Sequence, residues 1–176
     1  MLKKLSLIAP VVGAVLALTL LLNFTFTRVN AYATDAPSSP ITASQRMKDL
    51  ECLARNIYFE SASEPFEGKV AVAQVTLNRV ESGKFPASIC QVVYQKNVFY
   101  EKVVCQFSWY CNSPATLKVR SPAQYEESME VAKKVLLEGF RLPGLTTAMY
   151  YHADYVNPGW KKPRITKIGR HIFYQG

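Results

Sequence analysis

Hydrophobic residues early in the chain recur at helical spacing. Between residues 46 and 60 they return every three or four positions, which predicts an amphipathic helix. A second helix is expected over about 63–82, with Ser63 as its N-cap, and a third over about 121–139, with Ser121 as its N-cap. The apolar face of the first helix comprises Met47, Leu50, Leu53, Ala54 and Ile57.

The end of the chain has strand patterns instead. Residues 148–152 read as one strand, and residues 165–168 and 171–174 flank Gly169-Arg170, a pair suited to a two-residue hairpin turn. Helices first and a small C-terminal antiparallel sheet last predict an α+β fold.

The first 33 residues have the pattern of an export segment. Lys3 and Lys4 precede an uncharged, apolar run that lasts until Arg28, and a small-x-small pattern ends at Ala33. The run is longer than the ~7–15 residues of a usual signal core and approaches the ~20 that span a bilayer. We expect a signal peptide, or an anchor in the cytoplasmic membrane if the segment stays uncleaved.

Residues 34–45 are rich in Pro, Ser, Thr and Ala and lack hydrophobic periodicity, so they are expected to form a flexible linker. The folded domain is then expected over residues 46–176. This location outside the cytoplasm predicts a protein of the periplasm or cell envelope.

Composition and charge limit the kinds of partner that the chain is expected to bind. The 176 residues are 49% hydrophobic and 19% charged, which excludes a disordered chain and suits about one domain. The net charge of +8 favours an anionic partner. Because the domain is expected outside the cytoplasm, we expect peptidoglycan as its partner and not nucleic acid. Five basic residues and no acid between Lys161 and Arg170 are either a solvated face or a polymer-binding edge.

Four cysteines follow the export segment, and an even count in an exported domain indicates two disulfides with three possible pairings. Cys105 and Cys111 close a short loop and are the preferred pair, which leaves Cys52 with Cys90. A zinc site on these cysteines is not favoured, because close pairs at finger-like spacing are absent.

Three glutamates cluster between the first two predicted helices. Glu64 and Glu67 begin the second helix, where acids commonly interact with the helix dipole. Glu60 instead ends the first helix beside Tyr58 and Phe59, where the dipole and desolvation both disfavour its charged form. A carboxyl group with a raised pKa is what a general acid needs near neutral pH.

The chain resembles the SleB/CwlJ-type cell wall hydrolases, which include the spore cortex-lytic enzymes, over about residues 50–174. The motifs that carry this resemblance are Leu53 to Gly68, Val70 to Val80, Phe85-Pro86, Val92-Val93-Tyr94, Cys105 to Trp109, Tyr150-Tyr151-His152, Ile168-Gly169, His171 and Phe173-Tyr174. It implies a small lysozyme-like α+β domain that cleaves the peptidoglycan glycan strand as a lytic transglycosylase. We expect no cofactor and no metal. The family's catalytic glutamate corresponds to Glu60. The chain departs from the family next to it, with Ser61-Ala62-Ser63 where Ala-Arg-Gly is common.

Other residues of these motifs suit a sugar substrate. Neutral hydrogen-bonding groups suit N-acetyl groups and aromatic rings suit sugar faces, and the candidates for substrate binding are Gln106, Phe107, Ser108, Trp109, Tyr150, Tyr151 and His152. His152 either orients Glu60 or substrate, or is simply hydrogen-bonded in place.

We expect protonated Glu60 to cleave between N-acetylmuramic acid and N-acetylglucosamine and to leave 1,6-anhydro ends. Three alternatives stay open. A hydrolytic muramidase or glucosaminidase would use Glu64 or Glu67 to position water. A degenerate relative would bind the wall without cleaving it. A zinc peptidase would use His152, Asp154 and His171 as ligands.

Overall fold

The computed structural model describes residues 42–112 and 114–176. The predicted export segment and residues 34–41, eight of the twelve residues of the predicted linker, lie outside these residues. Helix α2 (Ala43–Ser61) begins earlier than the predicted residue 46, because the Thr42 side chain accepts a hydrogen bond from Gln45 N (3.1 Å) and caps it. Its buried face matches the predicted one except at Met47, which lies in an early turn and is 54% exposed. No helix in the described ranges has both the length and the apolarity that crossing a bilayer requires.

Helix α3 (Phe66–Glu81) is the second predicted helix, but Ser63 does not cap it. Glu64 N donates to Ser61 O (3.0 Å), so the chain at Ser63 is still turning out of α2, and the extended Pro65 occupies the N-cap position. Most of α3 is buried, and its buried polar side chains have partners inside the domain. Asn78, for example, donates to the carbonyls of Leu145 (2.7 Å) and Ala148 (2.8 Å).

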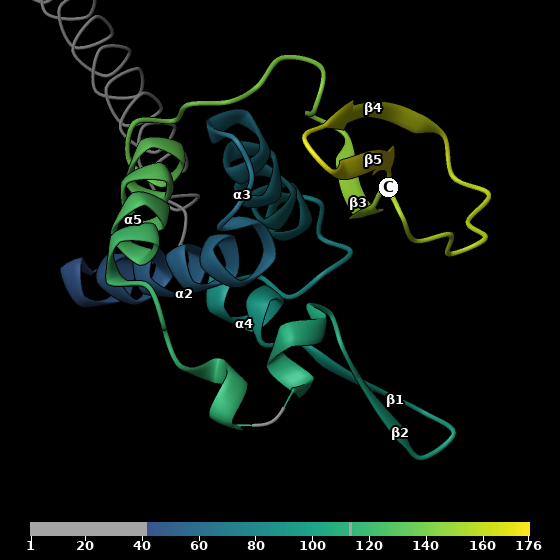
Figure 1. The fold of residues 1–176 in the computed structure, drawn as a ribbon, viewed down its shortest axis with the longest axis horizontal. Helices are drawn as coiled ribbons and strands as arrows, with labels where there is room; N and C mark the ends of the chain where they lie inside the picture. The colour runs from purple at the N-terminus through teal and green to yellow at the C-terminus, as the bar shows by residue number, and fades with distance from the viewer. Residues whose placement is uncertain (1–41, 113) are drawn as a thin grey trace, which may run out of the picture. The chain divides into compact units, whose positions relative to one another are not determined.

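Helices α3, α4 (Ile89–Val93) and α5 (Pro122–Leu136) pack against α2 (Figure 1). The predicted cap of α5 is confirmed, because Ser121 accepts from Gln124 N (3.4 Å). The structure contains two disulfides, Cys52–Cys90 and Cys105–Cys111, which is the pairing that the sequence favoured. The first of them joins α2 to α4.

Strands β1 (Lys96–Phe99) and β2 (Lys102–Cys105) form an antiparallel hairpin that the sequence analysis did not predict. Tyr100 and Glu101 form its turn with φ of 46° and 66°. Glycine or asparagine usually occupies such left-handed positions, so the usual sequence signal for a hairpin is missing. Two short 3-10 helices, η1 (Ser108–Cys111) and η2 (Pro114–Leu117), lead from β2 toward α5.

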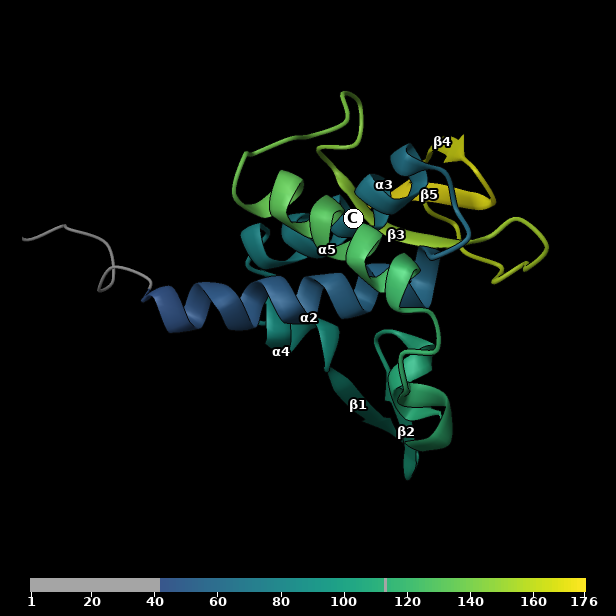
Figure 2. The ribbon, with the colours of Figure 1, turned by 60° about the vertical axis from the view of Figure 1, so that its left-hand side comes forward.

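Strands β3 (Ala148–Ala153), β4 (Arg164–Ile168) and β5 (His171–Gln175) form the predicted C-terminal sheet. The order is β3-β5-β4, with both pairs antiparallel. Gly169, with φ of 55°, lies in the turn between β4 and β5. The sheet packs on α3 through β3 and β4, and it stands apart from the β1–β2 hairpin in both views (Figures 1 and 2). The predicted α+β class is confirmed, with the β1–β2 hairpin added.

Candidate active site

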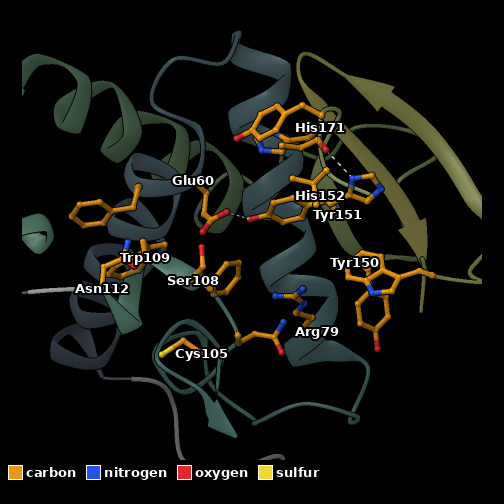
Figure 3. Close-up of a pocket in the computed structure, with 17 residues that line it drawn as sticks. Glu60, Arg79, Cys105, Ser108, Trp109, Asn112, Tyr150, Tyr151, His152 and His171 are labelled. Atoms are coloured by element: carbon orange, nitrogen blue, oxygen red, sulfur yellow. Dashed lines mark hydrogen bonds between the residues drawn. The ribbon is translucent and has the colours of Figure 1, made fainter. Parts of the chain in front are cut away.

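Glu60, in the last turn of α2, lines a pocket of about 860 Å³. The other walls come from the end of α3, the segment after β2, strand β3 and the loop that follows it (Figure 3). The lining residues are Phe59, Glu60, Arg79, Cys105, Gln106, Phe107, Ser108, Trp109, Asn112, Tyr150, Tyr151, His152, Ala153, Tyr155, Val156, Trp160 and His171. The pocket therefore joins segments that are distant in the sequence around one carboxyl group.

Two opposed effects act on Glu60. Burial raises its pKa, while a hydrogen bond from Tyr151 and the charge of Arg79 lower it, and burial is the largest of the three. Tyr151 Oη donates to Glu60 Oε2 at 2.9 Å, as the dashed line in Figure 3 shows. Burial also raises the pKa of Tyr151 well above its ordinary value, so this phenol stays a donor. Glu60 can thus hold a proton at a higher pH than a free glutamate does, in a fixed orientation.

Arg79, near the end of α3, is a pocket residue that the sequence analysis missed. It is only 3% exposed, and its Nε donates to Met149 O at 2.8 Å. In the amide orientation that satisfies both groups, Gln106 Oε1 accepts from both terminal guanidinium nitrogens at 3.2 and 3.3 Å. Arg79 therefore fixes Gln106 and brings positive charge toward Glu60. The signal available in the sequence was a single arginine in a predicted helix that is rich in apolar residues.

The seven predicted substrate-binding residues all line this one pocket. Phe107 and Trp109 are nevertheless buried, at 3% and 6% exposed, and contribute mainly to the core. Trp109 stacks on Phe59 with ring centroids 4.5 Å apart, and its Nε1 donates to Asn56 Oδ1 at 3.0 Å. The sequence analysis missed the exposed Tyr155 and Trp160 of the β3–β4 loop, which also line the pocket.

The two histidines lie in the pocket wall without contacting Glu60. His152 Nδ1 lies 2.8 Å from Ala153 O, which can only accept, so Nδ1 carries a proton, and Nε2 is hydrogen-bonded to Tyr174 Oη at 2.9 Å. His152 is thus hydrogen-bonded in place, and Tyr151 orients Glu60 instead. His171 is buried, which lowers its pKa, and its ring packs edge-on against Tyr151.

The other candidate acids lie outside the pocket. Glu64 Oε2 accepts from Arg170 N at 2.8 Å, which ties the start of α3 to the β4–β5 turn. Glu67 is exposed in the first turn of α3. Asp154 pairs with Lys167 at 2.8 Å. Within residues 42–112 and 114–176, no three His, Cys, Asp or Glu side chains gather as metal ligands would. The water-positioning alternative therefore lacks its acids in this pocket. The zinc alternative has His152 and His171 in the pocket wall but no third ligand gathered with them among the described residues.

Comparison with known proteins connects this geometry to a family. A family model described as Cell Wall Hydrolase matches residues 63–174, so Glu60 lies just before the matched stretch. The spore cortex-lytic enzyme of Bacillus cereus (strain ATCC 14579) is 32% identical over 129 residues, which are 71% of this chain and 43% of that protein. The spore cortex-lytic enzyme of Bacillus subtilis (strain 168) is 28% identical over 151 residues, which are 84% of this chain and 44% of that protein. The chain thus spans less than half the length of these relatives.

Solved structures give the same picture. The catalytic domain of the Bacillus cereus SleB protein superposes with a TM-score of 0.55 at 28% identity, covering 73% of this chain and 91% of that one. The catalytic domain of the germination-specific lytic transglycosylase SleB from Bacillus anthracis gives a TM-score of 0.56, also at 28% identity. It covers 78% of this chain and all of that one.

Proposed function

The chain belongs to the cell wall hydrolase family, and from that premise we propose that it cleaves the glycan strand of peptidoglycan with Glu60 as acid and base. One observation carries the proposal. Glu60 is the only carboxylate among the described residues that line the main pocket, and its pKa is raised while Tyr151 holds it at 2.9 Å.

A single carboxyl group suits a lytic transglycosylase. Protonated Glu60 donates its proton to the oxygen between N-acetylmuramic acid and N-acetylglucosamine, and the bond from that oxygen to the muramic anomeric carbon breaks. The Glu60 carboxylate then accepts the proton of the muramic C6 hydroxyl, whose oxygen bonds to the anomeric carbon and closes a 1,6-anhydro ring. Because this nucleophile belongs to the substrate, no second carboxylate is needed to hold water.

The surrounding residues support these steps. The Tyr151 hydrogen bond strengthens when Glu60 becomes a carboxylate, which stabilises the state between the two proton transfers. Gln106, fixed by Arg79, offers a neutral contact for an N-acetyl group. Tyr150 and Trp160 expose ring surface to the same pocket and can stack on sugar faces.

The decisive variant is Glu60→Gln, whose amide fills the same space but cannot act as a carboxylic acid. General acid catalysis contributes about 10²–10⁴-fold, so we expect at least a 100-fold loss of glycan cleavage without loss of the fold. Glu64→Gln is the matched control and should cleave at nearly the parent rate, because an amide oxygen can still accept from Arg170 N. Release of muropeptides from purified peptidoglycan measures both.

Mass spectrometry of the new chain ends distinguishes the reaction types. We expect 1,6-anhydro muramic ends, which are lighter than reducing ends by one water. Reducing muramic or glucosamine ends as the main product would instead indicate hydrolysis. A parent protein that sediments with the wall and produces no new ends would be a binding protein.

We further propose that residues 1–33 deliver the domain of residues 46–176 to the cell envelope, since its proposed substrate lies outside the cytoplasmic membrane. The support is the charge and hydropathy pattern of that segment. Fractionation of cells that make the full chain should recover it from the periplasm if cleaved, or from the membrane at full length if not.

A further inference from the structure

A second pocket of about 300 Å³ adjoins the active site. Its lining residues are Tyr58, Phe59, Ala62, Lys118 and Arg120. Phe59 lines both pockets and immediately precedes Glu60, so the two pockets meet at the end of α2. A ligand in the second pocket would therefore lie beside the end of α2 that carries Glu60.

The basic segment that forms one wall of this pocket is fixed to α2. Arg55 Nη2 donates to Leu117 O at 3.2 Å. Tyr58 Oη accepts from the backbone nitrogens of Arg120 and Ser121 at 3.0 and 3.1 Å. These bonds hold the backbone that carries Lys118 and Arg120, so this segment is in place beside the end of α2 before any ligand binds.

The charge of the second pocket selects an anion. Lys118 and Arg120 are exposed, and none of the ion pairs that the structure describes involves either. No acid is among its described lining residues, and the Ala62 side chain that lines it is small. Arg79, the cation of the main pocket, is already engaged by Met149 and Gln106. Among the residues that line the two pockets, the cations available to an anionic group of the substrate are therefore Lys118 and Arg120.

Resting on the proposed function, we propose that the second pocket binds carboxylates of the acidic stem peptide that muramic acid carries. The peptide leaves the muramic ring at C3, two bonds from the anomeric carbon at which the strand is cleaved. A ring placed for attack at Glu60 therefore has its peptide arm within reach of a neighbouring pocket. In a peptide-bearing strand the lactyl carboxyl is bound in the amide to the peptide, so the sugars carry no charge and the stem-peptide carboxylates are the anions that two cations would bind.

The test compares two substrates on the full chain. Lys118→Ala/Arg120→Ala should raise KM about 3- to 10-fold on solubilised glycan strands that carry stem peptides, with kcat unchanged. On strands whose peptide carboxylates have been converted to neutral amides, KM should change less than about 2-fold, since those interactions are already lost. Lys48→Ala/Lys84→Ala removes the same charge from exposed positions outside both pockets and is the matched control. Equal melting temperatures verify folding.

A binding measurement separates this inference from the proposed reaction. In a Glu60→Gln background, the Lys118/Arg120 variant should bind peptide-bearing strands about 3- to 10-fold more weakly and amide-converted strands equally well. The inference survives on that result even if the parent protein cleaves nothing, which would overturn only the proposed function. An equal effect on both strands, or none on either, overturns the inference.

Discussion

Glu60 lies between an apolar environment that favours its protonated form and two polar groups that favour its charged form. Tyr151 supplies the only direct hydrogen bond to Glu60 that the structure describes, and it lies 91 residues away in the sequence. The position of Glu60 at a helix end could be predicted from sequence alone. Its partner could not, because adjacent Tyr150, Tyr151 and His152 are equally suited to hydrogen bonding, and only the pleat of β3 decides which of them points toward α2.

Removing the Tyr151 hydroxyl should shift the pH dependence of cleavage. Its hydrogen bond favours the carboxylate and lowers the pKa of Glu60, so Tyr151→Phe raises that pKa. Because activity falls as the acid deprotonates, the alkaline limb of the kcat/KM profile should move to higher pH, by about 0.5–1 unit. The maximum rate should also fall, since Glu60 loses its orientation.

Tyr174→Phe is the matched control for this profile. It removes a phenol hydroxyl from the same sheet, but one that contacts His152 and not Glu60. Its alkaline limb should stay at the parent position. A Tyr151→Phe limb that stays there too, or moves to lower pH, would show that the hydrogen bond does not act on the catalytic acid.

At the scale of elements, the β4–β5 turn is fastened to the start of α3. Glu64 accepts from Arg170 N at 2.8 Å, and a Cβ on the adjacent Gly169 would collide with that same carboxylate. Since β5 carries His171 and pairs with β3, this bond helps to place β3, and with it Tyr151, against α2. Glu64 thus has a structural role. It directly follows Ser61-Ala62-Ser63, where the chain departs from the family pattern.

Gly169→Ala should therefore cost more stability than a left-handed conformation alone explains. An L residue at φ of 55° costs about 1–2 kcal/mol, and loss of the Glu64 bond adds about 1 kcal/mol more. Gly139→Ala is the matched control, because Gly139 has φ of 71° with no atom within 4 Å of the added Cβ. Urea unfolding should place Gly169→Ala about 1 kcal/mol below Gly139→Ala. Equal losses would mean that the Glu64 contact contributes nothing.

The sequence predicted well those elements whose structure is determined by residues close together in the chain. Helical spacing and the Ser121 cap gave α2, α3 and α5, and Gly169-Arg170 gave the β4–β5 turn. The β1–β2 hairpin was missed because Tyr100 and Glu101 adopt left-handed conformations that these residue types do not predict. Arg79 was missed because its partners, Gln106 and Met149, come from other elements, and no local pattern marks such contacts.

At the scale of the whole molecule, the two disulfides stabilise different things. Cys52–Cys90 joins residues 38 apart and links α2 to α4 in the core, whereas Cys105–Cys111 joins residues 6 apart. The shorter loop contains η1 and the pocket residues Gln106 to Trp109, and Cys105 itself lines the pocket. The long bridge should therefore serve global stability, and the short bridge should serve the shape of the active site.

Paired alanine variants separate these two contributions. From loop-closure entropy, Cys52→Ala/Cys90→Ala should lose about 4 kcal/mol of unfolding free energy, and Cys105→Ala/Cys111→Ala about 2 kcal/mol.

The loss of activity in these two variants should follow the opposite order. Measured at low temperature, where both variants remain folded, Cys52→Ala/Cys90→Ala should keep nearly the parent kcat/KM. Cys105→Ala/Cys111→Ala should lose about 10-fold or more, because misplacing Gln106 and Ser108 weakens substrate positioning. Urea unfolding and muropeptide release measure the two orders. If the variant with the larger stability loss also lost more activity, the short bridge would have no special part in the active site.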